Sequence, residues 1–182
     1  IMGDREYKMR ALRQIGLLKA QNPAKLAKAG KKPKEWGPGF PSAVGAAAAR
    51  KPEQVAIIDD AGQMTWGEVL DEVNRLSAAL KANGIGAGDP VAVLCRNHRH
   101  MVIAMVAIMQ IGGRMLLLNT MASGAQLVEL TKREGAKMVL LDQEFLAIAT
   151  DLDRENLVIA WADDDTHGLR TLSDLTKGQP TD

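Results

Sequence analysis

The sequence is poor in cysteine, in aromatic residues and in long apolar runs. Its 182 residues include a single cysteine, Cys95, and only 3% aromatic residues. One cysteine allows no internal disulfide and no cysteine-based metal site, which fits a reducing compartment. No apolar run reaches about 18 residues, the length of a membrane-spanning helix, and no apolar signal core follows the basic N-terminus. These absences predict a cytoplasmic protein.

The remaining composition is that of a globular domain with an aliphatic core. Hydrophobic residues make up 46% of the chain and charged residues 25%, and the length suffices for one domain with a substantial core. The nine methionines are interpreted as core filler, because the flexible thioether side chain fits irregular gaps.

Charge is distributed unevenly along the chain. Residues 1–35 hold ten Lys or Arg and three Asp or Glu, a net charge of +7, whereas residues 36–182 hold thirteen and nineteen, a net charge of −6. We therefore divide the chain into a basic helical segment, 1–35, and an α/β subdomain, 36–182. The basic segment can dock on the acidic body, remain a solvated face or contact an anionic membrane surface, which would make the protein peripheral. Nucleic acid is not expected as a partner, because almost no aromatic residue is interleaved with the charges.

A strand–helix–strand pattern at 91–119 organises the chain. The apolar runs Val91–Cys95 and Met115–Leu118 have the length of strands buried on both faces. Between them, Met101–Ile111 is apolar almost all round and predicts a buried helix. Two more apolar strands, Met138–Leu141 and Leu157–Ala160, alternate with helices. The pattern predicts an α/β fold with a mostly parallel sheet flanked by helices, and with a helical N-terminal extension.

Local signals place the other elements. Ser42 is expected to cap a helix at 43–50, Thr65 and Glu68 to form a capping box, and Ser123 to cap a helix at 124–134. The glycines of 84–88 follow a helix and precede a strand, so they predict a helix stop and turn rather than a phosphate loop. The other expected elements are helices at 4–21, 24–29, 67–82, 143–149 and 169–175, and a hairpin at 55–66.

No established catalytic motif occurs in the sequence. There is no Gly-x-Gly-x-x-Gly between strand and helix, no Gly-Lys-Ser/Thr loop and no Gly-x-Ser-x-Gly elbow. The aspartates of 163–165 are adjacent and point in different directions, so with His167 they are interpreted as a solvated loop rather than a metal site.

The cluster Arg96-Asn97-His98-Arg99 is the most interesting chemically. It follows a parallel strand, where open α/β sheets place ligand crevices. Two interpretations remain open. Asn97 could cap the following helix while His98 packs nearby, or the cluster could contact a ligand.

The order of features resembles the start of the adenylate-forming acyl-CoA synthetases, the fatty-acid–CoA ligases of the AMP-binding superfamily. The matching stretches are Lys51–Asp59, Met64–Val69, Gly84–Leu94, Cys95–Arg99, Ile111–Thr120 and Gln126–Leu130. The Cys-Arg-Asn-His-Arg stretch is similar to that of actinobacterial-type members. The resemblance covers roughly residues 40–182, and the order of the motifs is more specific than any one of them.

The resemblance implies an enzyme that uses ATP, Mg²⁺ and CoA to convert a fatty acid into its acyl-CoA through an acyl-adenylate. The family's phosphate loop, ending in Pro-Lys-Gly, does not occur in these 182 residues. We therefore expect the N-terminal fragment of a ligase, without catalytic, cofactor-binding or metal-binding residues. Asn97, His98 and Met101 are expected at the edge of the substrate crevice. The alternative is a non-catalytic βα interaction module that associates with itself or with a membrane surface.

Overall fold

The computed structural model describes residue 6 and residues 39–181. The elements are α3 (Phe40–Arg50), β1 (Val55–Asp59), β2 (Gly62–Thr65), α4 (Trp66–Ala82), β3 (Pro90–Leu94), α5 (Arg99–Gln110), β4 (Arg114–Leu117), α6 (Gly124–Glu134), β5 (Met138–Asp142), the 3₁₀ helices η1 (Gln143–Ile148) and η2 (Arg154–Asn156), β6 (Leu157–Trp161), β7 (Arg170–Thr171) and α7 (Leu172–Thr176). The helices predicted at 4–21 and 24–29 and the basic segment 1–35 lie outside the described residues, apart from Glu6.

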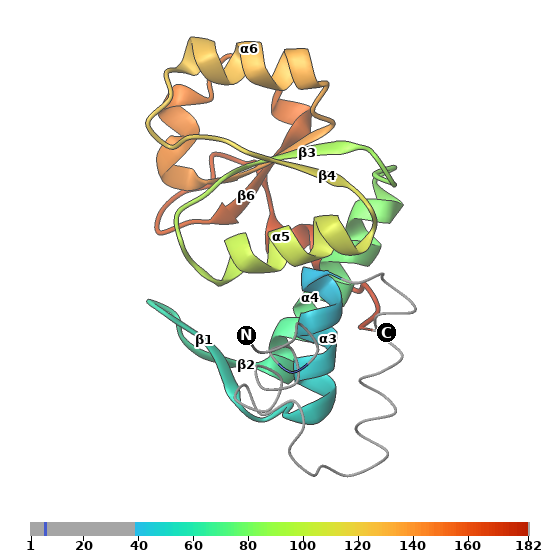
Figure 1. The fold of residues 1–182 in the computed structure, drawn as a ribbon. Coiled ribbons are helices and arrows are strands. Elements are labelled where there is room, and N and C mark those ends of the chain that lie inside the picture. Colours follow the sequence, from blue (N-terminus) through green and yellow to red (C-terminus); the bar gives the residue numbers. More distant parts are fainter. Residues whose placement is uncertain (1–5, 7–38, 182) are drawn as a thin grey trace.

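Five parallel strands form the central sheet, in the order β4-β3-β5-β6-β7. Helix α6 covers one face of this sheet and α5 the other (Figure 1). Strands β1 and β2 form a separate antiparallel hairpin beside α3 and α4. The predicted α/β class with a parallel sheet flanked by helices is confirmed.

The sheet is buried on both faces, as its continuous apolar strands require. Alternate residues of β3 point to opposite sides, so Val91 and Val93 join the core under α4 and α5, whereas Ala92 and Leu94 join the core under α6. The face of α4 that packs into the first core includes the four residues expected from its period, Val69, Val73, Leu76 and Leu80, together with Ala79.

Several predicted helix boundaries are confirmed because they depend on local chemistry. Thr65 and Glu68 form a capping box at the start of α4, and Ser123 forms one with Gln126 at the start of α6. Gly84 and Gly88 adopt positive φ angles of 76° and 82°. The glycine-rich stretch is thus the predicted turn between α4 and β3, where a side chain would strain the backbone.

Other predicted helix boundaries differ from those in the structure. Helix α3 starts at Phe40 with Gly39 as its N-cap, and Ser42 is buried inside the helix instead of capping it. Pro41 lies in the first turn, where its fixed φ favours helix and its missing N–H costs nothing. The helix predicted at 143–149 is present as the 3₁₀ helix η1, which ends one residue earlier, at Ile148. The helix predicted at 169–175 was also misplaced, because residues 170–171 pair with β6 as an edge strand before α7 begins.

Candidate functional site

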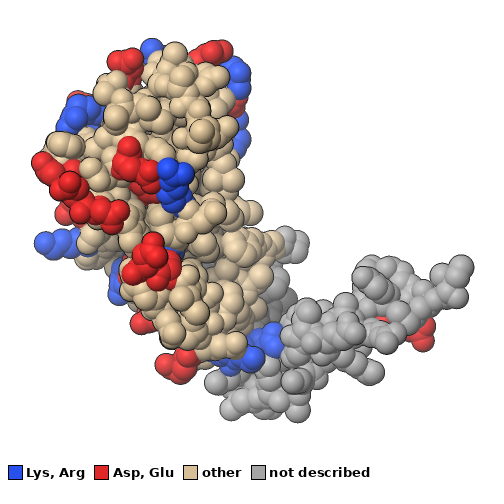
Figure 2. All heavy atoms as spheres, turned by 90° about the vertical axis from the view of Figure 1, so that its left-hand side faces the viewer, with Lys and Arg blue, Asp and Glu red and all other residues tan. Residues whose placement is uncertain are grey.

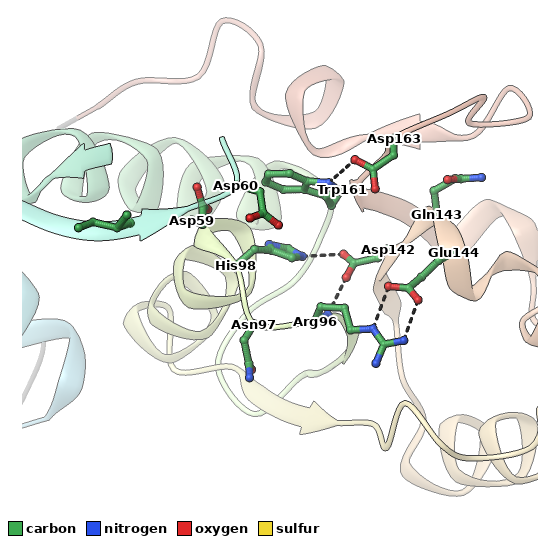
Figure 3. Close-up of a pocket in the computed structure, with 11 residues that line it drawn as sticks. Asp59, Asp60, Arg96, Asn97, His98, Asp142, Gln143, Glu144, Trp161 and Asp163 are labelled. Carbon is green, nitrogen blue, oxygen red and sulfur yellow. Dashed lines mark hydrogen bonds and ion pairs between the residues drawn. The ribbon is translucent and has the colours of Figure 1, made fainter. Parts of the chain in front are cut away.

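A cavity of about 260 Å³ lies at the carboxyl end of the parallel sheet. From the neighbouring ends of β3 and β5, the chain continues to opposite sides of the sheet, from β3 to β4 and from β5 to β6. Such a switch in direction leaves a crevice between the two strand ends. The residues that line it come from the hairpin and from the ends of β3, β5 and β6: Ile58, Asp59, Asp60, Arg96, Asn97, His98, Asp142, Gln143, Glu144, Trp161 and Asp163 (Figure 3).

Asp142 is the buried centre of this site. It ends β5 and is 3% exposed. One carboxylate oxygen accepts the backbone N–H of Arg96 at 2.6 Å, and the other lies 2.9 Å from Nε2 of His98. These bonds hold the chain after β3 against the end of β5, and they satisfy a carboxylate that would be costly to bury alone.

His98 caps helix α5, which corrects the interpretation that Asn97 is the cap. Its Nδ1 accepts the backbone N–H of His100 at 3.2 Å, so the neutral ring carries its proton on Nε2 and donates it to Asp142. The ring also packs against the indole of Trp161, with centroids 4.9 Å apart. His98 therefore links β3, β5 and β6.

Arg99 joins the hairpin to this framework. Its guanidinium and its backbone N–H both donate to the carboxylate of Asp59, and Nη2 also donates to the carbonyl of Gly62. The Arg99 and Asp59 side chains are only 15% and 7% exposed. Hydrogen bonds from Arg99 hold the pKa of Asp59 well below its usual range. The hairpin wall of the cavity is thus fixed by a buried ion pair.

Asn97 differs from its neighbours Arg96, His98 and Arg99 because its side chain is not held by other described residues. It is exposed, and its side chain makes no hydrogen bond with any described residue. Figure 3 shows it directed away from the Asp142 cluster, whereas the Arg96 guanidinium is engaged by Glu144 through bonds of 2.9 and 2.8 Å. Met101 is half-buried against the core and does not line this cavity. Of the three predicted crevice residues, the structure thus brings Asn97 and His98 to the cavity.

Sequence reasoning missed Asp59, Asp142 and Trp161 as parts of the site. A signal existed for the last two, because each directly follows a predicted apolar strand, and each ends the strand that the structure has. Asp59 could not be found in this way, since it reaches the site from the hairpin through a partner 40 residues away.

Most of the charged residues that line the cavity are acidic, although Arg99 pairs with Asp59 and Arg96 with Glu144. Five carboxylates and one guanidinium, that of Arg96, are among its lining residues, and Figure 2 shows acidic side chains gathered over the middle of one face of the molecule. A polyphosphate, which carries several negative charges, would be repelled here. This cavity therefore does not fit a polyphosphate.

Burial shifts the pKa values of two further groups close to the cavity, Cys95 and His100. Burial and the neighbouring Asp142 charge raise the pKa of the Cys95 thiol, which makes it a poor nucleophile at neutral pH. Burial lowers the pKa of His100, whose Nδ1 has no hydrogen-bond partner among the described residues. No helix in the described part of the chain is both long and apolar enough to cross a membrane.

Comparison with known proteins identifies the family to which this chain belongs. The sequence profile of the AMP-binding enzymes matches residues 44–181, so the chain belongs to the AMP-binding enzyme family. A medium/long-chain-fatty-acid–CoA/3-oxocholest-4-en-26-oate–CoA ligase of Mycobacterium marinum is 37% identical over 68 residues, which are 37% of this chain and 12% of the relative. A 2-succinylbenzoate–CoA ligase of Bacillus licheniformis is 35% identical over 75 residues, 41% of this chain and 16% of the relative.

Solved structures agree on the fold. A putative long-chain-fatty-acid CoA ligase from Rhodopseudomonas palustris superposes with a TM-score of 0.68 at 20% identity, over 77% of this chain and 36% of that one. An anthranilate CoA ligase in complex with anthranoyl-AMP gives a TM-score of 0.64 at 22% identity, over 72% of this chain and 26% of that one. The predicted resemblance to adenylate-forming acyl-CoA ligases is confirmed. The aligned region is a small part of each of these relatives.

Proposed function

We propose that this chain is the N-terminal part of an ATP-dependent fatty-acyl-CoA ligase. The parent enzyme would activate a fatty acid as its acyl-adenylate and transfer the acyl group to CoA, with Mg²⁺ assisting at ATP. The observation that carries the proposal is the family match over residues 44–181, joined to similarity with a fatty-acid–CoA ligase that this segment covers only to 12%. The 182 residues alone would not form an acyl-adenylate, because they contain no Pro-Lys-Gly phosphate loop.

An exchange assay tests the proposed dependence on the rest of the enzyme. The purified 182-residue chain is incubated with ATP, Mg²⁺, labelled pyrophosphate and fatty acids of several lengths. We expect no acid-dependent incorporation of label into ATP. Incorporation that requires a fatty acid would overturn the proposal, because these residues would then hold a complete adenylation site.

Within this function, Asn97 is the residue that we propose contacts the substrate. It is polar, exposed and free of structural bonds to the described residues, and it points away from the acidic cluster. An amide in this position can donate to a substrate oxygen without adding charge. His98 and Met101 would position Asn97 without touching the substrate. His98 would hold the loop after β3, and Met101 would anchor the first turn of α5 against the core.

A chimera tests this role. Residues 39–181 replace the corresponding segment of the Mycobacterium marinum ligase, and Asn97→Ala is compared with Asn156→Ala. Asn156 ends η2 directly before β6, at the opposite end of the strands from the cavity. We expect Asn97→Ala to lower kcat/KM for the fatty acid about tenfold, as for one lost hydrogen bond of about 1.4 kcal/mol, and Asn156→Ala to leave it unchanged. Equal effects of the two substitutions would refute the contact.

A second candidate function is an interaction module that associates with itself. Met121, Ile58 and Leu117 are 86%, 72% and 55% exposed, and β4 is an edge strand of the sheet. Open strands and exposed apolar side chains favour association. Sedimentation over a range of concentrations tests it, because a module of this kind forms a defined dimer, which Leu117→Lys should dissociate. A monomer at all concentrations would contradict it.

A further inference from the structure

Three potential metal ligands converge beside the cavity. The thiol of Cys95, a ring nitrogen of His98 and a carboxylate oxygen of Asp142 all lie within 4.8 Å of one another. Cys95 directly follows β3, His98 caps α5 and Asp142 ends β5, so the fold brings them together from separate parts of the chain. We propose that Cys95, His98 and Asp142 form a binding site for a thiophilic divalent cation, zinc foremost.

The spacing of the three side chains suits a tetrahedral site. Zinc holds sulfur at about 2.3 Å and nitrogen or oxygen at about 2.0–2.2 Å, which places the ligand atoms about 3.3–3.7 Å apart. His98 Nε2 and Asp142 are 2.9 Å apart, and no pair in the cluster exceeds 4.8 Å. Small side-chain rotations therefore reach the required geometry. Three protein ligands leave a fourth position for water, on the side of the cavity that His98 and Asp142 line.

In this structure, the His98 ring and the Cys95 thiol carry protons on the atoms that would bind the cation. The ring proton of His98 lies on Nε2 toward Asp142, and the thiol of Cys95 lies 3.8 Å from the carbonyl oxygen of Leu140. Binding would release the thiol proton to solvent and move the ring proton from Nε2 to Nδ1. The thiolate and the carboxylate together then balance the divalent charge. The new Nδ1 proton would then face the backbone N–H of His100, now 3.2 Å from Nδ1, so the His98 ring has to turn away from the start of α5, a cost that opposes binding.

The donor set defines which cations fit. A thiolate with an imidazole selects zinc and similar transition metals, whereas Mg²⁺ takes oxygen ligands and retains its waters. The proposed site is therefore separate from the Mg²⁺ that a ligase would use with ATP, and it does not depend on the proposed function. It revises the expectation that a single cysteine excludes a cysteine-based metal site, because His98 and Asp142 supply the other ligands.

Cobalt(II) provides a direct test on the intact 182-residue chain. The reduced protein is titrated with cobalt(II) while its absorption spectrum is recorded. We expect one equivalent to bind, with a sulfur-to-cobalt charge-transfer band in the near ultraviolet, visible bands typical of tetrahedral geometry, and displacement of both by zinc. The absence of a charge-transfer band at saturating cobalt(II) overturns the proposal, and this result needs no variant.

Matched variants locate the binding. Cys95→Ser should abolish the charge-transfer band and weaken zinc binding by at least about 100-fold, since it removes a direct ligand. His167→Gln is the control, because His167 is an exposed histidine beside Asp165 and outside the cluster. It should leave stoichiometry and affinity unchanged. Loss of binding in His167→Gln, with retention in Cys95→Ser, would assign the metal to the surface loop and contradict the site.

Discussion

The buried ion pair between Asp59 and Arg99 gives the sharpest prediction about stability. Asp59→Asn keeps the size of the side chain but removes the negative charge to which the guanidinium and the backbone N–H of Arg99 donate. With the Arg99 and Asp59 side chains only 15% and 7% exposed, the arginine would be left largely buried and without its directly bonded counter-charge, with only the weaker charge of Glu68 nearby. Breaking a buried pair in this way costs about 3–5 kcal/mol, and we expect about 3 kcal/mol because the pair lies at the edge of the core.

The pair Arg96–Glu144 is a natural control. It has the same two-pronged geometry, but its side chains are 57% and 49% exposed. Exposed pairs contribute little because water screens them, so Glu144→Gln should leave stability nearly unchanged.

The assay is urea unfolding followed by far-ultraviolet circular dichroism, with Arg99→Met and the double variant completing a cycle with Asp59→Asn. We expect the effects of the two single substitutions to be strongly non-additive. If Asp59→Asn costs no more than Glu144→Gln, or if the double variant equals the sum of the two single ones, the hairpin is not held by this pair and the reasoning is refuted.

Three other predictions follow. Because the folded-state pKa of Asp59 is lowered, its contribution to the free energy of unfolding is complete above the unfolded value of about 4 and is lost as pH falls through the folded value. The free energy of unfolding should therefore fall more steeply below a pH of about 4 in the wild type than in Asp59→Asn. Parallel curves for the two proteins would contradict this. Leu76→Ala, at a fully buried position of α4, should cost about 2–5 kcal/mol in urea unfolding, and a loss below about 1 kcal/mol would show that α4 does not pack as described. Deleting residues 1–35, with their net charge of +7, should abolish salt-sensitive binding to anionic liposomes if the segment contacts membranes, whereas equal binding without it would exclude that role.

The fold was predictable from the sequence where local chemistry or periodicity determines it. The buried strands around 91–94 and 138–142 and the capping boxes at Thr65 and Ser123 are short-range signals, and the structure has them all. The errors arose where two local signals competed. Ser42 is a good cap, but Pro41 favours an earlier helix start, and the ring of His98 supplies the cap that one of the two interpretations assigned to Asn97.

The site was predictable only in its location. That a crevice opens beyond β3 follows from the parallel sheet, and Asn97 and His98 do line it. The partners that determine its chemistry are distant in sequence: Asp142 lies 44 residues from His98, and Asp59 lies 40 residues from Arg99. No periodicity or motif encodes such pairs, since they arise from the order of strands in the sheet. The negative charge of the cavity likewise appears only once these segments are assembled.

The central claim, that this chain belongs to a fatty-acyl-CoA ligase, is tested most directly in the gene. Sequencing should continue past the codon for Asp182. We predict a reading frame that continues into a Ser/Thr/Gly-rich loop ending in Pro-Lys-Gly within a few tens of residues, as the resemblance to acyl-CoA synthetases implies. A stop codon directly after Asp182, or a continuing frame without such a loop, would contradict the ligase assignment and leave the interaction module as the better account.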